Sequence, residues 1–188
     1  MTTPSTLPTL IVVSGLPATG KTTLAAHLRR ELGLPLIAKD ALKEALASAL
    51  PENQSISRDT SRHIGRQAMT LMFAFARDLI ESGTPCIVES NFIPALAVND
   101  FEPFHSCACV RQVHCSLPQT VMLERYQRRI DQGERHAIHV DTVAIGEIVG
   151  RIAEGGSEPI PLGAPLLQVS TIDGYEPPLP QIIAFCRA

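Results

Sequence analysis

Aromatic residues, cysteine and net positive charge are all scarce in this sequence. Aromatic side chains make up only 4% of the chain and the formal net charge is −3, so the stacking surfaces and the positive field of a general nucleic-acid binder are missing. The five cysteines are an odd number and include no CxxC pair, which disfavours both a disulfide framework and a zinc site. We expect these cysteines to be reduced and mostly buried.

Long apolar runs and a leader segment are also lacking. No hydrophobic stretch approaches the roughly 20 residues of a membrane span. The first ten residues carry no basic segment of the kind that begins a signal peptide. We therefore expect a cytoplasmic protein, monomeric or homodimeric, without a membrane partner.

The composition is that of a chain with a full hydrophobic core. Of its 188 residues, 45% are hydrophobic, and folding at this length buries roughly 70% of the unfolded chain's surface. No Pro/Gly-rich linker divides the sequence. We expect a single domain over residues 1–188, with residues 1–8 as a flexible N-terminus.

Short apolar runs alternate with segments of helical periodicity. The runs are continuous enough to lie inside a sheet that is covered on both faces. We expect strands at 10–14, 34–38, 85–89, 108–114 and 166–170. We expect helices at 21–32, 40–50 and 58–82, a fourth that starts at a cap on residue 116 and runs to about 130, and a fifth that is capped by residue 141 and ends near 155. Ser116 and Gln119 have the spacing of a capping box for the fourth helix. This alternation predicts an α/β fold with a mostly parallel sheet.

The first expected strand is followed by a glycine-rich segment of the form GxxxxGK[ST], directly before a helix. Glycines let such a loop wrap a phosphate with its N–H groups inward, and the helix N-terminus adds a favourable dipole. Lys21 is suited to the β- and γ-phosphates and the Thr22 hydroxyl to Mg²⁺. The alternative is a glycine-rich turn with a chance lysine. The expected nucleotide-binding residues are Gly15, Leu16, Pro17, Ala18, Thr19, Gly20, Lys21, Thr22 and Thr23.

Two carboxylates follow expected strands, at the sheet edge where open α/β folds bind ligands. Asp40 follows the second strand and could orient an acceptor hydroxyl and take its proton. Its alternative role is a helix N-cap. Glu89 and Asn91 follow the third strand, where they could contact magnesium or substrate, or be a loop-facing polar pair with no ligand.

Arginines gather in two further places. Residues 125–140 combine an Arg-rich helix end with Gly133 and suggest a lid, in which Arg128 and Arg135 are the phosphate-contacting candidates. Solvated arginines at a helix C-terminus are the alternative. Arg58, Arg62 and Arg66 share one face of the long helix, where they could bind an anionic acceptor or form a solvated face; we take Arg62 as the substrate candidate. His136 and His139 lack a third ligand, and we expect no metal site there.

The segments GLPATGKTT, KDALK, CIVESNF, and RYQRR followed by RH, occur in the order found in a group of P-loop kinases. Over residues 10–153 the sequence resembles the group containing chloramphenicol phosphotransferases, zeta-toxin kinases and polynucleotide 5′-kinases. The resemblance implies a five-stranded sheet in the kinase-type order 2-3-1-4-5 with helices on both faces and an Arg-bearing lid. It also implies ATP and Mg²⁺ as cofactors, Asp40 as the base, and a lid carrying Arg128 or Arg135.

The sequence departs from the group at two points. Lys43 stands where the group often has arginine, and Ala137 and Ile138 replace the Pro-Gly pair of its frequent RHPGH lid motif. From their place after the last strand, we expect residues 170–180 to border the adenine.

Together these features predict transfer of the γ-phosphate of MgATP to a hydroxyl of a small molecule. One alternative is a 5′-end nucleic-acid kinase, in which the arginines of the long helix follow a phosphate backbone. Another is a nucleotide-binding regulatory ATPase that acts through a partner protein.

Overall fold

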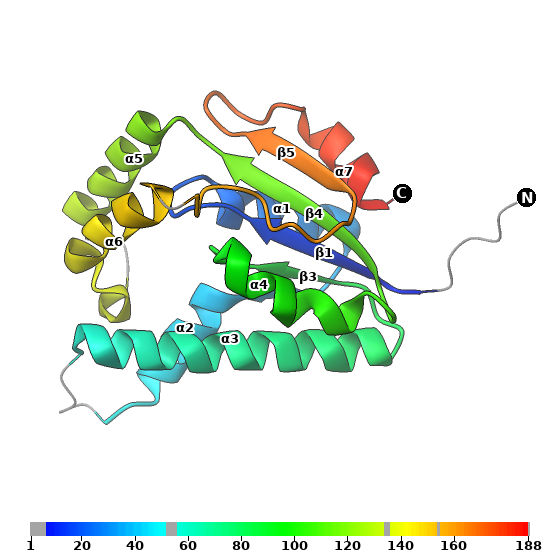
Figure 1. Ribbon diagram of the computed structural model, residues 1–188, viewed down its shortest axis with the longest axis horizontal. Coiled ribbons are helices and arrows are strands. Elements are labelled where there is room, and N and C mark those ends of the chain that lie inside the picture. Colours follow the sequence, from blue (N-terminus) through cyan, green and yellow to red (C-terminus); the bar gives the residue numbers. More distant parts are fainter. Residues whose placement is uncertain (1–6, 52–55, 134–135, 154, 188) are drawn as a thin grey trace, which may run out of the picture.

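The computed structural model describes residues 7–51, 56–133, 136–153 and 155–187 and has five parallel strands in one sheet (Figure 1). The strand order is β2-β3-β1-β4-β5, and every pairing is parallel. This confirms the expected order and makes the sheet wholly parallel. The strands are β1 (Thr9–Ser14), β2 (Leu36–Ala38), β3 (Cys86–Glu89), β4 (Cys109–Ser116) and β5 (Leu166–Ser170).

Helices cover both faces of the sheet. They are α1 (Lys21–Leu32), α2 (Lys39–Ser48), α3 (Arg58–Glu81), α4 (Pro94–Phe101), α5 (Gln119–Gln132), α6 (Asp141–Ala153) and α7 (Leu179–Arg187), with two short 3₁₀ helices, η1 (Glu102–Phe104) and η2 (Ala137–His139). In Figure 1, α5 and α6 lie together beyond the carboxyl ends of the strands, and α3 runs along one side of the molecule.

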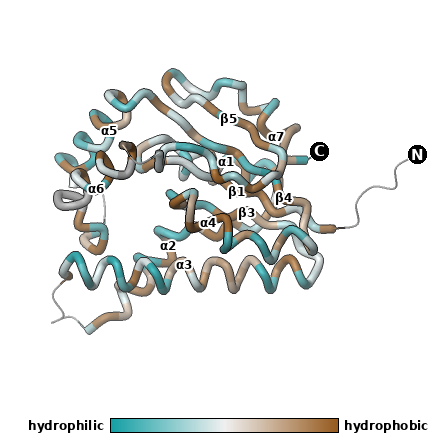
Figure 2. The backbone as a smooth tube through the Cα atoms, in the orientation of Figure 1, coloured by the Kyte–Doolittle hydropathy of each residue, from teal (hydrophilic) through white to brown (hydrophobic). Residues whose placement is uncertain are grey.

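The alternation of β1 side chains builds two cores. Leu10 and Val12 pack with side chains from α3 and α4, whereas Ile11 and Val13 pack with side chains from α1 and α7. Successive residues of a strand face opposite sides, so one fully buried apolar strand serves both layers. Figure 2 shows hydrophobic residues along the strands and alternating hydropathy along α3.

The register of the strands aligns the residues that precede the site. Ala38 at the end of β2 pairs with Glu89 of β3, and Glu89 pairs with Val13 of β1. The segments that follow β1, β2 and β3 therefore leave the sheet at one edge, as the rule for ligand sites in open α/β sheets requires.

The expected helix at 21–32 and the strand at 166–170 are confirmed at both ends. The capping box expected from Ser116 is wrong: Ser116 is the last residue of β4, and Pro118 precedes α5 without a side-chain cap. Helix α7 was not expected, and the helix that separates the third and fourth strands, α4, had been given no bounds. Residues 1–6 of the expected flexible N-terminus and residues 134–135 of the expected lid lie outside the described residues.

All five cysteines are free thiols, and Cys86, Cys115 and Cys186 are buried, as expected. Within the described ranges, none of the helices combines the length and apolarity needed to cross a bilayer.

Candidate active site

The loop between β1 and α1 has the backbone geometry of a phosphate cradle. Gly15 has φ +137° and Gly20 has φ +79°, values that a residue with a side chain rarely adopts. A Cβ atom on Gly15 would lie 2.3 Å from the carbonyl oxygen of Cys115, so the loop and β4 are too close for any side chain there. Ala18 also has a positive φ, of 63°. The loop is thus held in a strained form of the kind found at ligand sites.

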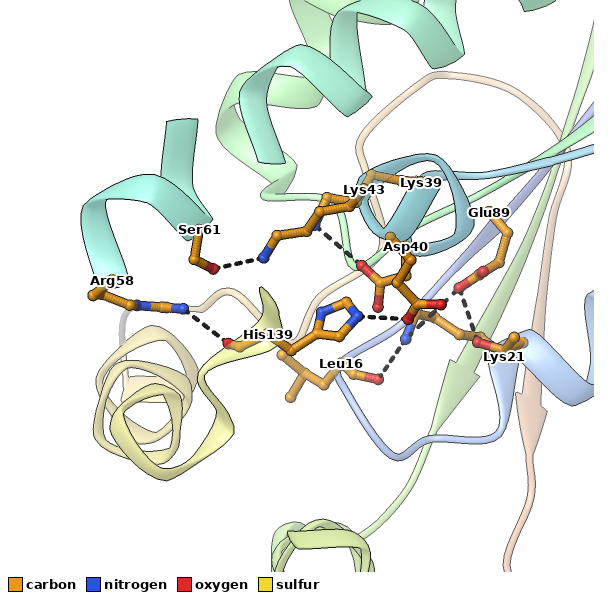
Figure 3. Close-up of polar contacts among 11 residues, drawn as sticks. Leu16, Lys21, Lys39, Asp40, Lys43, Arg58, Ser61, Glu89 and His139 are labelled. Carbon is orange, nitrogen blue, oxygen red and sulfur yellow. Dashed lines mark hydrogen bonds and ion pairs between the residues drawn. The ribbon is translucent and has the colours of Figure 1, made fainter. Parts of the chain in front are cut away.

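Lys21 and Thr22 begin α1 and turn toward Glu89 at the end of β3. The Lys21 Nζ lies 3.7 Å from Glu89 Oε1 and 3.4 Å from the Leu16 carbonyl oxygen, while the Thr22 hydroxyl donates to Glu89 Oε1 at 3.3 Å (Figure 3). Burial raises the pKa of Glu89, an effect that the nearby Lys21 ammonium and the Thr22 hydrogen bond oppose. The predicted Lys21, Thr22 and Glu89 therefore lie together.

Thr22 and Glu89 fit a magnesium ion chemically. Both offer hard oxygen donors, and Mg²⁺ in phosphate-transfer sites takes few protein ligands beside water and phosphate oxygens. Within the described part of the chain there is no group of three or more His, Cys, Asp or Glu side chains that could hold a metal alone. This small oxygen donor set is consistent with an ion that is bound together with a nucleotide.

One cavity lies over the phosphate cradle and is rimmed by arginines. It encloses about 470 Å³ and is lined by loop and α1 residues together with Arg125, Arg128 and Arg129 of α5. Of the two lid candidates, Arg128 lines this cavity, whereas Arg135 is outside the described residues. Arg129 was not singled out from the sequence, although helical spacing places it on one face with Arg125.

Arg125 joins α5 to the loop that follows β5. Its guanidinium donates to the carbonyl oxygens of Thr171 and Ile172, both at 2.9 Å. The Thr171 hydroxyl in turn donates to the Thr19 carbonyl oxygen at 2.8 Å. The start of the 170–180 segment therefore lies against the phosphate cradle.

A second cavity of about 390 Å³ lies between α2, α3, α4 and α6. Asp40, Asn91 and Arg62, three of the predicted substrate residues, line it, as do Arg58 and Arg66. Lys21, Thr22 and Arg129 line both cavities. The two cavities therefore meet at the residues that the sequence assigns to the terminal phosphates.

Asp40 is not the N-cap of its helix. α2 begins at Lys39 with Ala38 in the cap position, so Asp40 lies in the first turn, and its carboxylate accepts from Lys39 Nζ at 3.1 Å. The alternative of a plain cap is wrong, and Asp40 faces the second cavity.

Contacts between α6 and α3 close one end of this second cavity. Glu147 of α6 pairs with Arg58 and with Arg62, whose Nη2 lies 2.8 Å from Glu147 Oε1. The two guanidinium groups lower the pKa of Glu147 to about 2. In addition, buried His139 of η2 lies 2.7 Å from a carboxylate oxygen of Glu44 in α2. The positions of these residues in the sequence do not indicate that they form pairs.

Fold, strand order and phosphate cradle define a P-loop protein of the kinase type. The chain belongs to the AAA domain family, whose model matches residues 10–153. It is 35% identical to a candidate kinase from Chloroflexus aurantiacus J-10-fl, with a TM-score of 0.83 and coverage of 96% of this chain and 97% of that one.

Two further structures share the fold at low identity. A sugar kinase from Janibacter sp. HTCC2649 is 14% identical, with a TM-score of 0.63 and coverage of 96% and 95%. A chain of the Pnkp1/Rnl/Hen1 RNA repair complex is 17% identical, with a TM-score of 0.55, over 83% of this chain and 49% of that one. No functionally curated protein matches the sequence.

Proposed function

We propose that this protein transfers the γ-phosphate of MgATP to a hydroxyl group of a small molecule. The observation that carries the proposal is the meeting of two cavities at Lys21, Thr22 and Arg129, with Asp40 in the second cavity only. A nucleotide on the glycine-rich loop would present its terminal phosphate at this junction. An acceptor in the second cavity would then meet it from the side of Asp40. A small-molecule kinase also agrees with the kinase assignment of the Chloroflexus relative.

In the nucleotide cavity, backbone N–H groups and cationic side chains would bind the phosphates. The loop N–H groups and the N-terminus of α1 attract phosphate oxygens, and Lys21 with Arg128 or Arg129 neutralises the charge that shifts during transfer. Thr22 and Glu89 would hold magnesium, which would supply neutralisation of phosphate charge during transfer. Arg135 stays a candidate for the same role.

The acceptor side relies on Asp40. The acceptor oxygen forms a bond to the γ-phosphorus, the bond from that phosphorus to the ADP oxygen breaks with its electron pair going to ADP, and Asp40 takes the hydroxyl proton. Lys39 Nζ lies 3.1 Å from the Asp40 carboxylate and helps to fix its orientation. Asn91 lines the same cavity and is suited to hydrogen-bond the acceptor.

Asp40→Asn should lower the turnover of a true substrate by about 10²- to 10⁴-fold, the usual contribution of a positioned general base. Lys21→Ala should nearly abolish transfer. Each variant is tested with ATP and a panel of sugars, antibiotics, nucleosides and oligonucleotide ends, in which mass spectrometry detects the added phosphate. Asp78→Asn, on the exposed side of α3, is the matched control and should retain activity. Unchanged turnover in Asp40→Asn would show that Asp40 is not the base.

The two alternatives predict different results from the same panel. A 5′-end nucleic-acid kinase would phosphorylate oligonucleotide ends with activity that falls steeply with salt. A regulatory ATPase would give no phosphorylated small molecule and would bind a protein partner only with ATP. The pairing of Arg58 and Arg62 with Glu147 favours the small-molecule interpretation, because these arginines point at a carboxylate of this chain.

A further inference from the structure

The second cavity is strongly positive, although the chain as a whole carries a formal charge of −3. Seven lysine and arginine side chains and three carboxylates line it. Lys21 and Arg129 also line the nucleotide cavity and have the ATP phosphates to bind. The remaining five cations line only the second cavity, so their charge is not explained by the nucleotide.

The carboxylates in this cavity leave at least one cation unmatched. Glu147 pairs with Arg58 and Arg62, and Asp40 pairs with Lys39. The third carboxylate, Asp100, forms no ion pair with a residue that the structure describes. Arg66 lines the cavity one helical turn beyond Arg62. It forms no hydrogen bond or ion pair through its side chain with any residue that the structure describes.

Lysines from α2 come close to α3 beside Arg66. Lys43 is buried and donates to the Ser61 hydroxyl at 2.7 Å (Figure 3). A Cβ atom built on Gly65 would lie 3.8 Å from Lys43 Cε and 3.9 Å from Lys39 Nζ, so both lysine stems cross the helix at this glycine. Lys39 and Lys43 of α2 thus line the cavity at Gly65, the neighbour in sequence of Arg66. Like charges at close range repel, and an anion between them would relieve that repulsion.

Apolar side chains from α4 and the residues before it also line the cavity, beside Asn91 and Asp100 of the same segment. They include Phe92, Ile93 and Leu96, and the exposed fraction of Leu96 is 62%. Phe92 is held in place by edge contact with the Phe101 ring, at 5.2 Å between centroids. The cavity therefore offers apolar contact surface in addition to its basic side chains.

We propose that the phosphate acceptor carries an oxyanion, a carboxylate or a phosphate ester, in addition to its hydroxyl group, and that Arg66 binds this oxyanion together with Lys39 and Lys43. The carbon skeleton lies against Phe92, Ile93 and Leu96, and the hydroxyl faces Asp40. This inference rests on the proposed function and specifies its substrate class. Arginine is suited to the role because its planar fork binds carboxylate or phosphate oxygens in pairs.

The test uses matched pairs of acceptors that differ only in the anion. Hydroxy carboxylates are compared with their methyl esters, and sugar phosphates with the parent sugars, by kcat/KM for transfer from ATP. The anionic member of a productive pair should be favoured by about 10- to 100-fold, as expected for a charged hydrogen bond. Carboxylate and phosphate pairs reveal which oxyanion is preferred.

Variants then assign the effect to Arg66. Arg66→Gln should reduce the preference for the anionic member at least about 10-fold, and Arg66→Lys should restore part of it. Arg77→Gln is the matched control, since Arg77 lies three turns further along α3, outside the cavity, and should keep the preference. Equal kcat/KM for both members of every productive pair, or an unchanged preference in Arg66→Gln, would overturn the inference.

A binding measurement separates this inference from the proposed function. Calorimetry with a non-hydrolysable ATP analogue filling the first cavity measures uptake of the same hydroxy carboxylates and sugar phosphates. Binding of at least one of them by the wild type and by Arg77→Gln, with loss in Arg66→Gln, supports the anion site even if no transfer occurs. No binding of any anionic compound overturns it. Transfer to neutral acceptors alone would support the proposed function while refuting the anion site.

Discussion

Gly15 occupies the most constrained position of the phosphate cradle. Its φ is +137°, and a Cβ atom at this position would lie only 2.3 Å from the Cys115 carbonyl oxygen, which leaves no room for substitution. Gly15→Ala should therefore destabilise the fold by about 1–3 kcal/mol and abolish nucleotide binding, because the loop must move away from β4. Urea unfolding and ATP calorimetry measure the two effects.

Gly146→Ala is the control for this prediction. Gly146 lies inside α6, and a Cβ atom there would meet nothing within 4 Å. Replacing a helix-interior glycine with alanine stabilises by about 0.5–1 kcal/mol, so this variant should be at least as stable as the wild type. If both variants bind ATP equally well, the cradle does not depend on Gly15.

The buried thiols should resist alkylation. Burial raises the pKa of Cys86 and Cys186 to about 11 and that of Cys115 to about 12. These thiols stay protonated at pH 8, and the thiolate is the reactive form. Mass spectrometry after iodoacetamide treatment should show adducts on no more than the half-buried Cys107 and Cys109 in the native protein, and on all five cysteines in urea. An early adduct on Cys115 would contradict its burial.

Among the helices, α6 is attached to α3 by the charge pairs of Glu147 with Arg58 and Arg62. The pKa of Glu147 is lowered from the ordinary carboxyl value of 4.5 to about 2. Its ionised form therefore contributes its full stability above pH 4.5, and this contribution is lost as the pH falls from 4.5 to about 2. Glu147→Gln should lower the urea midpoint at pH 7. The difference from the wild type should shrink progressively below pH 4.5.

Glu124→Gln on the exposed surface of α5 is the matched substitution. The Glu124 side chain makes no hydrogen bond or ion pair with other described residues, so its removal should leave the midpoint almost unchanged at every pH. A pH-independent difference between Glu147→Gln and the wild type would mean that the charge pairs do not stabilise the contact between α6 and α3.

Most of the elements were predictable because their signals are local. The apolar strands and the periodicity of α1 and α3 depend on neighbouring residues, and these elements were placed to within a few residues. Helices α4 and α7 were given no bounds because each carries proline in its first turn, at Pro94 and Pro180, which suggests a loop in sequence. Proline is tolerated in that turn because the N–H it lacks has no partner within the helix.

The residues of the candidate site also fall into two groups: those that local sequence signals predict, and those whose contacts depend on how distant segments pack. The spacing of the glycine-rich motif and the position of Asp40 after a strand predicted the residues that meet at the two cavities. The pairing of Arg58 with Glu147 joins residues 89 positions apart and leaves no trace in spacing. Arg129 was recoverable from the helical face that it shares with Arg125, whereas the close approach of Lys39 and Lys43 to Gly65 depends on how α2 packs against α3.

At the scale of the whole molecule, MgATP should stabilise the fold. Its proposed site is built from the β1–α1 loop, α5 and the segment after β5, so unfolding would destroy it completely. A ligand at 100 times its Kd stabilises by about 2.7 kcal/mol, which for a chain of this size raises Tm by roughly 5–10 °C. Thermal unfolding followed by circular dichroism measures the shift, and Lys21→Ala should show a much smaller one. Equal shifts in both proteins would place the nucleotide elsewhere.

The two cavities adjoin, and Lys21, Thr22 and Arg129 line both of them. Inhibitors that join an adenosine polyphosphate to a hydroxy-acid mimic would therefore need only a short tether. Occupying one half places the other half at high effective concentration, so such a hybrid should outcompete either fragment alone. Two chemically distinct subsites could in this way be blocked by one molecule.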